Sequence, residues 1–442
     1  MIVLNRKEKN RVDILFMYES KVREIEGVCL IAGELAKRGY CTAILETWEP
    51  LIKGQRKRPE AEVVFIPSAY TDRSLYALLR FVKGPAKVIN LQWEQIYSRR
   101  DLTNPNSPWK MSGDVHKVTH ISWGDVNYNK LTESDHIDKR MVKKVGHVGL
   151  DYLRKELRGF YLSREEICRE FDIDVNTRLC LFISSFSFVN LPENMIEPEL
   201  RELFEVSIRS QKEIVRWIVS VLEKHKELTF VYRPHPSEAG NAELAAIAAR
   251  EPRFKIIKDY SVKQWIIVSD IIYNWYSTSV AEVYFAGKSC FFLRPYPIAL
   301  QYECLIMEEL TSLNSCEEFE ESLNASGCDF PVPEEAIREN YFYDEKCPAY
   351  IRIADICEEL FRAKSGYLKK ELTLKERFNN LKLLVKNSGA GKMIEGLRGS
   401  REMDPKDAEY LKYITEMYNN NIVTESEFMS MKERLDRLGI WA

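Results

Sequence analysis

The stretch VDILFMYESKVREIEGVCLIAGELAKRGYCTAIL, residues 12–45, contains a strand, a helix and a second strand in succession. Residues 12–17 form a short apolar run, which is typical of a buried parallel strand. The apolar side chains of residues 25–38 recur at helical spacing, and Gly39 follows at the position where glycine commonly ends a helix. Residues 41–45 are again short and apolar. A strand, a crossover helix and a strand in this order predict a doubly wound α/β sheet.

The same alternation continues beyond residue 45 and then starts a second time. Further strands are expected over residues 62–66 and 86–91, with a helix over 74–82. A second series predicts strands over 178–183, 228–232, 254–257, 271–273 and 289–293 and helices over 210–226, 262–269 and 280–286. Two such series predict two Rossmann-like domains that face a cleft.

Domain ranges follow from the ends of the two series and from a helical, highly charged pattern after residue 350. We expect a Rossmann-like domain over residues 1–150, a connector over 151–171, a second Rossmann-like domain over 172–345, a helical return segment over 346–403 and a helical hairpin over 404–442. Thr424, followed three residues later by Glu427, fits a capping box at the start of the last helix.

The composition is that of a folded protein with a sizeable core. Of the 442 residues, 45% are hydrophobic and 30% charged, which excludes a disordered or collagen-like chain. With 64 Lys and Arg against 67 Asp and Glu the net charge is −3, so no overall basic field indicates a nucleic-acid partner. No apolar run approaches the about 20 residues that cross a bilayer, and residues 1–10 lack the apolar core of a secretion signal. We therefore expect a cytoplasmic protein.

The sequence predicts neither a bound metal nor a cofactor. Ten cysteines are scattered without a CxxC pair, which favours reduced, buried thiols. His116 and His120 are four residues apart, but no acidic residue completes a metal site, so both are interpreted as structural. The phosphate-binding patterns GxGxxG and GxxxxGKS or GxxxxGKT are absent, which argues against a nicotinamide enzyme and a P-loop nucleotidase.

The segment VYRPHPSE, residues 231–238, ends one of the strands expected in the second domain. In open α/β sheets, ligands bind outside the carboxyl ends of the strands. Two prolines restrict the backbone here, while Arg233 and His235 offer hydrogen-bond donors that suit a phosphate oxygen. A proline-rich turn with an incidental histidine would have the same sequence.

A second strand end carries a run of hydroxyls. In the segment SDIIYNWYSTSVAE, residues 269–282, Ser277, Thr278 and Ser279 stand where a strand passes into a helix. Free backbone N–H groups at a helix start, together with three hydroxyls, could hold an anion. Ser and Thr are also the usual N-caps of helices that bind nothing.

Together these two motifs resemble a pattern of bacterial cytidine-nucleotide-dependent transferases. Those families combine an R-x-H-P element with S-D-x-x-x-x-x-Y-S-S and an acidic residue in the next helix. They include the CDP-glycerol glycerophosphotransferases, the bacterial sialyltransferases and the Kdo transferases. The wider sequence is most similar to the surface carbohydrate biosynthesis proteins, whose R-E-x-E element resembles residues 23–26. The resemblance extends over residues 10–345 and implies the GT-B fold, with an acceptor-side first domain and a nucleotide-donor second domain.

The resemblance also implies a donor site in the second domain. It would consist of Arg233, His235, Ser277, Thr278, Ser279, Glu282, Ser184 and Ser185. Arg233 and His235 would contact the donor phosphate together with the hydroxyls at the helix start, and Glu282 would accept hydrogen bonds from the ribose. Ser184 and Ser185 would line the phosphate side of the cleft.

This chain departs from the family pattern at two points of the hydroxyl motif. Thr278 stands where the families usually have serine, a change that retains the hydroxyl. Asn274 and Trp275, before the tyrosine, are bulkier than usual, so the geometry of this loop does not follow from the resemblance.

The catalytic acid or base is expected from the first domain, where four carboxylates are candidates: Glu24, Glu26, Glu94 and Asp151. Such a group could act as a general base toward an acceptor hydroxyl or as a nucleophile in a double displacement. Acidic residues also favour helix starts through the helix dipole, without any catalytic role. The sequence does not rank the four securely, and Glu24 and Glu94 are the first choices.

Three functions remain open at this point. The leading hypothesis is a metal-independent glycosyltransferase that moves a sugar from a cytidine nucleotide, CMP-Kdo-like, into a bacterial surface polysaccharide such as capsule or lipopolysaccharide. The same motifs would serve a polyol-phosphate transferase that uses CDP-glycerol or CDP-ribitol. The third is a non-catalytic nucleotide- or glycan-binding assembly protein. In the first two the nucleotide donor is a substrate, and no cofactor is expected.

The expected partners are the donor and a glycan or lipid-linked glycan acceptor. A lipid-linked acceptor would bring the protein to the periphery of the inner membrane, where KGQRKR, residues 53–58, offers a basic cluster. A solvated surface loop would equally explain that cluster. The C-terminal helices could also mediate an oligomer.

Overall fold

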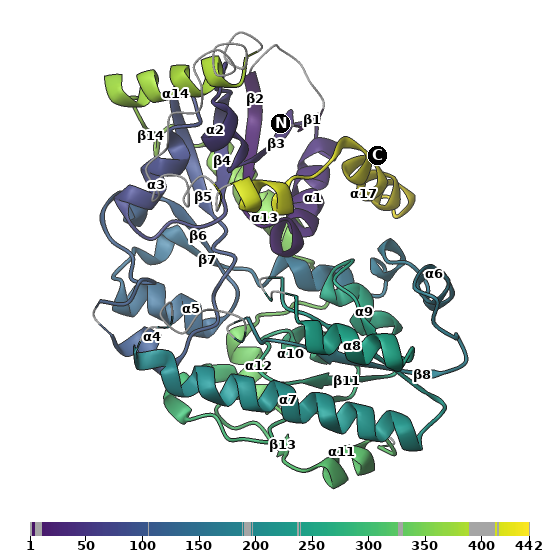
Figure 1. Ribbon diagram of the computed structural model, residues 1–442. Helices are drawn as coiled ribbons and strands as arrows, with labels where there is room; N and C mark the ends of the chain where they lie inside the picture. The colour runs from purple at the N-terminus through teal and green to yellow at the C-terminus, as the bar shows by residue number, and fades with distance from the viewer. Residues whose placement is uncertain are drawn as a thin grey trace, which may run out of the picture. The chain divides into compact units, whose positions relative to one another are not determined.

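The computed structural model describes residues 2–4, 11–104, 106–187, 189, 196, 198–236, 238, 240–325, 330–388, 412 and 415–441 (Figure 1). The chain forms two compact units. Unit 1 comprises Met1–Gln95, Pro105–Gly149 and Phe342–Ala442, and unit 2 comprises Ile96–Asn104 and Leu150–Tyr341. Each unit has its own largely parallel sheet and its own hydrophobic core. The predicted fold class of two Rossmann-like domains with additional C-terminal helices is confirmed.

The unit boundaries differ in detail from the ranges expected from sequence. Residues 96–104 pack with unit 2, where the N–H of Leu305 donates a 2.9 Å hydrogen bond to the carbonyl of Tyr97. Residues 342–345 belong to unit 1, where the N–H of Phe342 donates to Trp123 at 2.7 Å. Positions 389–403 of the expected return segment and 404–411 of the expected hairpin lie outside the described residues.

The sheet of unit 1 has the strand order β1-β3-β2-β4-β5-β6-β7, and β14 pairs with β5. Its strands are β1 (Ile2–Leu4), β2 (Arg11–Tyr18), β3 (Thr42–Glu46), β4 (Glu60–Ile66), β5 (Pro85–Asn90), β6 (Thr119–Ser122), β7 (Val142–Lys144) and β14 (Leu368–Lys369). β1 and β14 run antiparallel to their neighbours, and the other pairs are parallel. After β2 the chain builds β3 on one side and β4 on the other, so the topological switch point lies between β2 and β4.

The described helices of unit 1 are α1 (Lys21–Lys37), α2 (Glu49–Lys53), α3 (Asp72–Leu79), α5 (Asp125–Asn129), α13 (Ala349–Arg362), α14 (Leu374–Lys386) and α17 (Glu425–Arg437). α1 is mostly buried because its apolar side chains face both the sheet and α13, which packs beside it (Figure 1). α17 packs against α1 as well, so residues from the two ends of the chain meet on this helix.

The sheet of unit 2 has the strand order β10-β9-β8-β11-β12-β13, and all its pairs are parallel. Its strands are β8 (Arg178–Ile183), β9 (Leu228–Arg233), β10 (Phe254–Ile256), β11 (Ile271–Asn274), β12 (Cys290–Leu293) and β13 (Ser312–Leu313). Numbered within the unit, this is the order 3-2-1-4-5-6 of dinucleotide-binding Rossmann domains, with its switch point between β8 and β11.

The described helices of unit 2 are α4 (Arg99–Thr103), α6 (Arg164–Glu170), α7 (Arg201–Lys224), α8 (Ala242–Arg250), α9 (Val262–Val268), α10 (Val280–Ala286), α11 (Cys316–Ser322) and α12 (Glu334–Asn340). α7 begins nine residues before the predicted start at Ser210, and it buries Leu203 and Phe204 in that added part. The core under the sheet is rich in aromatic rings, among them Phe230, Tyr273 and Phe319.

Two further expectations concern thiols and membrane spans. The nine cysteines within the described ranges carry free thiols, and burial raises the pKa of those in the core, such as Cys29 and Cys180. None of the described helices combines the length and the apolar character needed to cross a membrane.

Candidate functional site

Three loops meet at the carboxyl edge of the sheet of unit 2. The loop after β8 begins at Ser184, the loop after β9 begins at Pro234, and the loop after β11 begins at Trp275. β8 lies between β9 and β11 and pairs with both, so these loops leave three adjacent parallel strands. This edge includes the switch point between β8 and β11, where open α/β sheets bind their ligands. Seven of the eight predicted donor-site residues lie in these loops or at these strand ends, and Glu282 lies in the first turn of α10.

Arg233 is buried, and its guanidinium donates to backbone carbonyls of its own unit. Nη1 donates to Ile257 at 3.4 Å and to Asp259 at 3.3 Å, and Nη2 donates to Tyr260. The side chain therefore ties the loop after β10 to the end of β9. Its predicted contact with a donor phosphate stays a prediction. His235, two residues later, is exposed at the carboxyl edge.

A buried carboxylate that the sequence analysis did not single out supports the His235 loop. Glu238 is 2% exposed, and its Oε2 accepts hydrogen bonds from Ser184 Oγ at 2.5 Å and from the backbone N–H of His235 at 3.2 Å. Its Oε1 accepts from Tyr232 Oη at 2.8 Å and from Gln211 Nε2 at 3.2 Å. Burial, aided by the charge of Glu238, raises the pKa of the Tyr232 phenol, which therefore remains a donor. Ser184 is thus part of a buried network that fixes the loop.

Asn274 shapes the loop after β11, and its role could not be read from the resemblance. Its Oδ1 accepts from the N–H of Ser277 at 2.8 Å, and its Nδ2 donates to the carbonyl of Ser277 at 2.8 Å. Ser277 Oγ in turn accepts from the N–H of Ser279 at 3.2 Å. The side chain at 274 therefore closes a turn that holds Ser277, Thr278 and Ser279 together, and all three remain partly exposed.

Trp275 connects two of the three loops. Its ring stacks on Phe186, with centroids 4.5 Å apart, so the loop after β8 and the loop after β11 are in contact. Ser185, next to Phe186, is partly exposed. Glu282 is also partly exposed, and its charge adds to burial in raising the pKa of Tyr341.

Arg294, at the end of β12, extends the same edge and was missed by the sequence analysis. It is 5% exposed, pairs with Glu303 at 2.8 Å, and its guanidinium lies 5.8 Å from the centroid of the Trp275 ring. Within the described residues neither Trp275 Nε1 nor Arg294 Nε has a hydrogen-bond partner. Both donors are enclosed by protein, so each contributes an unsatisfied polar group to the interior rather than an open binding site.

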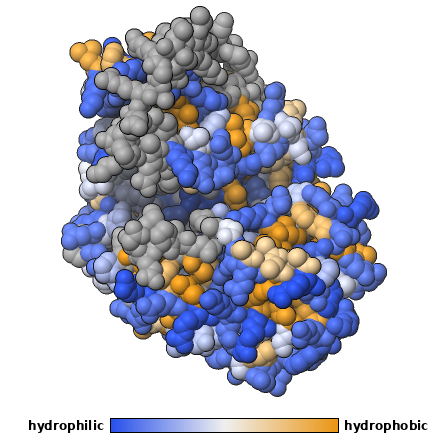
Figure 2. Space-filling view, in the orientation of Figure 1, coloured by the Kyte–Doolittle hydropathy of each residue, from blue (hydrophilic) through white to orange (hydrophobic). Residues whose placement is uncertain are grey.

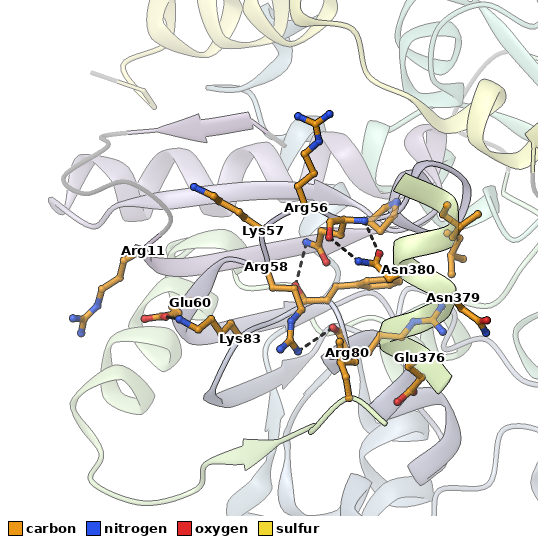
Figure 3. Close-up of a pocket in the computed structure, with 16 residues that line it drawn as sticks. Arg11, Arg56, Lys57, Arg58, Glu60, Arg80, Lys83, Glu376, Asn379 and Asn380 are labelled. Atoms are coloured by element: carbon orange, nitrogen blue, oxygen red, sulfur yellow. Dashed lines mark hydrogen bonds and ion pairs between the residues drawn. The ribbon is translucent and has the colours of Figure 1, made fainter. Parts of the chain in front are cut away.

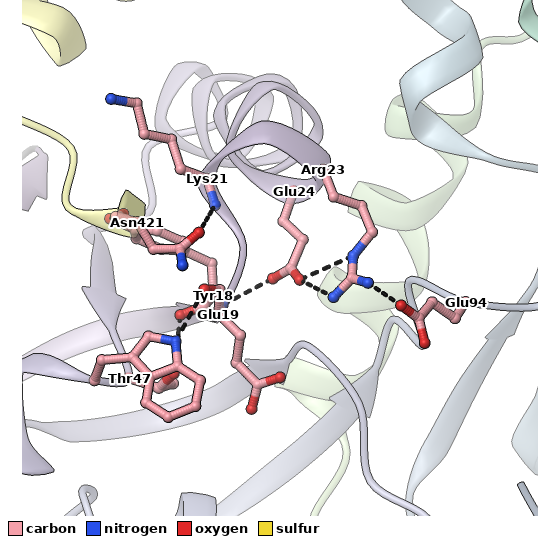
Figure 4. A network of polar contacts seen from close by, with 9 residues as sticks. Tyr18, Glu19, Lys21, Arg23, Glu24, Thr47, Glu94 and Asn421 are labelled. Atoms are coloured by element: carbon pink, nitrogen blue, oxygen red, sulfur yellow. Dashed lines mark hydrogen bonds and ion pairs between the residues drawn. The ribbon is translucent and has the colours of Figure 1, made fainter. Parts of the chain in front are cut away.

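Two of the four carboxylates predicted for the first domain, Glu24 and Glu94, lie at the carboxyl ends of β2 and β5 in unit 1 (Figure 4). Glu24, in the first turn of α1, is fully buried, and its Oε2 accepts from the N–H of Glu19 at 2.9 Å. Arg23 Nη2 donates to Glu24 Oε1 at 2.8 Å, and Arg23 also pairs with Glu94. Arg23 therefore joins Glu24 and Glu94, the two first choices, into one cluster.

Gly27 allows α1 to approach the loop that carries Glu94. A Cβ at this position would lie 2.7 Å from Cη2 of Trp93 and 2.7 Å from Cγ1 of Val148, which is closer than real side chains come. Glycine thus sets the distance between Glu24 on α1 and Glu94 beside Trp93.

Glu19 and Glu46 are two further carboxylates of this edge that the sequence analysis missed. Glu19 follows β2, and Glu46 ends β3. Burial raises the pKa of Glu19 to about 7, with the charge of Glu24 adding to the rise and that of Arg23 opposing it. Burial also raises the pKa of Glu46 to about 7, against hydrogen bonds from the N–H groups of residues 48 and 49. A carboxyl group with a pKa near neutrality can exchange a proton at working pH.

The other two predicted carboxylates have different surroundings. Glu26 is partly buried on α1, and its charge adds to burial in raising the pKa of Cys29. Asp151 belongs to unit 2, is 1% exposed and pairs with the equally buried Arg154 at 2.9 Å. A buried, charge-paired carboxylate is typical of a structural ion pair. The described residues contain no group of three or more His, Cys, Asp or Glu arranged to hold a metal ion.

Comparison with known proteins gives a structural match but no sequence match. No protein-family model matches the chain, and no curated sequence matches it significantly. The wall teichoic acid polymerase TagF, in a histidine-to-asparagine variant soaked with CDPG, matches with a TM-score of 0.50 at 11% identity, over 79% of this chain and 88% of TagF. A histidine-to-alanine variant of TagF matches with a TM-score of 0.50 at 13% identity, over 79% and 89%. The chain has the GT-B fold.

A second kind of protein matches somewhat less well. The UDP-GlcNAc 2-epimerase of Methanocaldococcus jannaschii, in complex with UDP-GlcNAc and UDP, has a TM-score of 0.48 at 14% identity. The match covers 79% of this chain and 99% of the epimerase.

Proposed function

We propose that the protein is a transferase that takes a group from a cytidine-nucleotide donor and passes it to an acceptor in bacterial surface-polymer synthesis. The observation that carries this proposal is the meeting of three loops at the β8–β11 switch point. The sequence motifs that resemble cytidine-nucleotide transferases fall in two of these loops, and the third contains Ser184 and Ser185.

In this proposal the donor phosphate lies against His235 and the hydroxyl-bearing turn of residues 277–279. Arg233 acts mainly by ordering the neighbouring loop, since its guanidinium donates to three carbonyls. Glu282 accepts hydrogen bonds from the ribose hydroxyls. Donors aimed at the leaving phosphate stabilise the charge that develops as the bond breaks.

The proton of the acceptor hydroxyl passes to a carboxylate of unit 1. The oxygen of the acceptor hydroxyl forms a bond to the carbon or phosphorus atom of the group being transferred. The nucleotide leaves with the electron pair of the bond that breaks. Glu24 and Glu94 are the sequence-based candidates for this base. The structure adds Glu19, because its pKa of about 7 lets it accept a proton at neutral pH and release it again.

Two groups fit the transfer. In the first form the donor is CMP-linked, Kdo-like, and the acceptor oxygen attacks the anomeric carbon of the sugar. In the second form the donor is CDP-glycerol or CDP-ribitol, and the oxygen attacks phosphorus. TagF, which is similar in fold, was solved after soaking with CDPG. For this reason we propose the second form on an equal footing with the first.

Thermal shift with CMP, CDP, UMP, UDP, GDP and ADP, each with and without EDTA, tests the donor class. A ligand at 100 times its dissociation constant adds about 2.7 kcal/mol to the stability of the folded state. We expect CMP or CDP to raise the melting temperature selectively and EDTA to leave the rise unchanged. His235→Ala should abolish the rise. His225→Ala is the matched control, because His225 precedes β9 at the opposite edge of the sheet.

Other outcomes separate the alternatives. A larger shift with UDP or GDP would contradict the cytidine donor, and the proposal of a nucleotide-dependent transferase would stand. Release of CMP from a CMP-linked sugar supports the glycosyl form, and release from CDP-glycerol supports the polyol-phosphate form. Nucleotide binding without turnover of either donor would favour the non-catalytic assembly protein. No shift with any nucleotide would overturn the proposal.

A further inference from the structure

Helix α14 carries an exposed apolar stripe along one side. Leu374, Phe378, Leu381 and Val385 are 84%, 57%, 56% and 48% exposed. At about 100° per residue, their spacing of four, three and four places all four within about 60° of the helix circumference. They account for four of the nine large hydrophobic residues that are exposed in the described structure. Single exposed apolar side chains need no explanation, but a continuous stripe does.

The opposite side of α14 attaches to unit 1 through polar contacts and through Leu383 and Leu384. Asn380 Oδ1 accepts from the N–H of Gln55 at 2.7 Å, and its Nδ2 donates to the carbonyl of Gln55 at 2.9 Å. Asn387 Nδ2 donates to the carbonyl of Ile52 at 3.0 Å. No residue of α14 is buried. An amphipathic helix of a globular protein normally turns its apolar face to the core. In α14 Leu383 and Leu384 face the body of the unit beside the amides, since both are partly buried and approach Gly54, and the exposed stripe is therefore a second apolar side of the helix.

Basic side chains accompany the apolar stripe. Lys375 and Lys382 lie along one side of it and Arg377 along the other, and all three are exposed. Lys382 Nζ lies 4.8 Å from the centroid of the Phe378 ring, so the cation and the apolar surface are adjacent. Glu376 is the one acidic residue of the helix, and it caps the helix start by accepting from the N–H of Thr373.

A basic cavity lies between α14 and the amino ends of β2, β4 and β5 (Figure 3). Its volume is about 780 Å³, and its lining includes six basic and two acidic side chains: Arg11, Arg56, Lys57, Arg58, Arg80, Lys83, Glu60 and Glu376. Arg56 and Lys57 are exposed, and they belong to the KGQRKR segment. The excess positive charge strengthens the field on the side of unit 1 that presents α14, and this field attracts anionic surfaces over about a Debye length.

We propose that α14 docks unit 1 onto an anionic lipid bilayer. The helix would lie in the plane of the interface, with the apolar stripe at the boundary of headgroups and acyl chains. Lys375, Lys382 and Arg377 would reach the lipid phosphates, and the cations of the cavity would add long-range attraction. An apolar face with flanking cations is the signature of interfacial helices. Figure 2 shows hydrophobic and hydrophilic surface next to each other over α14. The inference does not depend on the proposed enzymatic function.

Flotation of the full-length protein with vesicles tests this inference. We expect binding to vesicles of phosphatidylglycerol and phosphatidylethanolamine at low salt and little binding to phosphatidylcholine. The double variant Phe378→Gln, Leu381→Gln should bind at least tenfold more weakly. Val175→Gln with Leu300→Gln is the matched control, because these residues are 39% and 57% exposed but isolated in unit 2. The control should bind like the wild type.

Variants that remove positive charge, and hydrogen exchange measured in α14 of the wild type, provide two further tests. Lys375→Gln with Lys382→Gln should weaken binding by more than tenfold at low salt, since each basic residue near an anionic surface contributes roughly fivefold. Hydrogen exchange of the α14 amides should be slower with vesicles than without them. Equal binding by all variants, or hydrogen exchange in α14 that is the same with and without vesicles, would overturn the inference. A dimer that dissociates in Phe378→Gln, without vesicle binding by the wild type, would assign the stripe to a second copy of the chain and also overturn it.

Discussion

Asn421 caps a helix that begins 400 residues earlier in the chain: its Oδ1 accepts a 2.8 Å hydrogen bond from the backbone N–H of Lys21. The residue at the N-cap position of α1 is Ser20, whose side chain makes no capping hydrogen bond. The carbonyl of Asn421 also accepts from Tyr18 Oη at 3.2 Å (Figure 4). The C-terminal segment therefore completes the end of β2 and the start of α1, next to Glu19 and Glu24.

Replacing Asn421 should destabilise unit 1. Asn421→Ala removes the acceptor of a helix-terminal N–H, and N-cap losses cost about 1 kcal/mol of unfolding free energy. Asn421→Asp keeps an oxygen at the same place and should retain most of the stability. Asn420→Ala is the control, because that side chain is exposed. Urea denaturation followed by circular dichroism measures the difference. Equal midpoints for Asn421→Ala and Asn420→Ala would contradict the capping role.

Because the pKa of Glu19 is raised, we expect its contribution to the free energy of unfolding to fall as pH rises. Its pKa is about 7 in the folded protein and near 4.5 when unfolded, so the folded state binds more protons between these values. Its contribution is complete below pH 4.5 and is lost as pH rises through 7. The full shift corresponds to about 3 kcal/mol, and solvent screening of the partly exposed side chain reduces the expected loss to about 2 kcal/mol. Glu19→Gln should remove this part of the slope, and the exposed control Glu223→Gln should not. Urea midpoints at pH 5, 6, 7 and 8 decide, and parallel profiles for wild type and Glu19→Gln would refute the shift.

If Glu19 is the general base, the rate of transfer should depend on the ionisation of the Glu19 carboxyl group. The rate should rise as pH increases through 7, because only the ionised carboxylate accepts a proton. Glu19→Gln should lower kcat while leaving nucleotide-induced thermal shifts intact, since Glu19 belongs to unit 1 and the proposed donor site to unit 2. An unchanged pH–rate profile in Glu19→Gln would return the role to Glu24 or Glu94.

The strands were predictable because their signal is local. A buried parallel strand is a short apolar run, so β2, β3, β8 and β9 follow from the residues that form them. β14 has two residues, Leu368 and Lys369, and is a strand only because β5 lies beside it. Such an element has no periodicity of its own to detect.

The candidate site divides in the same way. The strand-end loops are visible in sequence because proline, serine and threonine cluster there. The contacts that hold these loops in place are not visible in sequence, because they join residues that are distant in the chain. Ser184, for example, donates a hydrogen bond to Glu238, which is 54 residues away. The pKa of Glu19 depends on burial and on neighbouring charges that only the fold brings together. Asn274 carried a local signal, since asparagine often hydrogen-bonds its own backbone in turns, but the resemblance drew attention to its bulk instead.

Arg233 and His235 should respond differently to substitution. Arg233→Lys keeps the charge but loses the fork that donates to three carbonyls, so we expect a loss of about 2 kcal/mol in unfolding free energy. His235→Ala affects an exposed ring and should cost less than 0.5 kcal/mol or so in stability while weakening nucleotide binding. Denaturation and nucleotide titration of both variants test this. A stable Arg233→Lys that fails to bind nucleotide would instead assign the guanidinium to the donor phosphate.

Glu238→Gln tests whether the buried network holds the His235 loop. The carboxylate accepts four hydrogen bonds, two at each oxygen, from Ser184, Tyr232, Gln211 and the N–H of His235. A glutamine has the same shape, but its amide nitrogen donates and cannot accept. One side of the network would then place donor against donor, which should cost about 2 kcal/mol of unfolding free energy and weaken nucleotide binding. Glu243→Gln, at the exposed start of α8, is the matched control.

A double-mutant cycle with Gln211→Ala shows which oxygen matters, because Gln211 Nε2 can only donate, whereas the hydroxyls of Ser184 and Tyr232 can turn to accept. If the new amide nitrogen faces Gln211, removing that donor relieves the conflict, and the double variant should be less destabilised than the sum of the single variants. Additive losses would place the amide nitrogen toward the N–H of His235 instead. If Glu238→Gln proved as stable as Glu243→Gln and bound nucleotide equally well, the loop would be held by its two prolines alone.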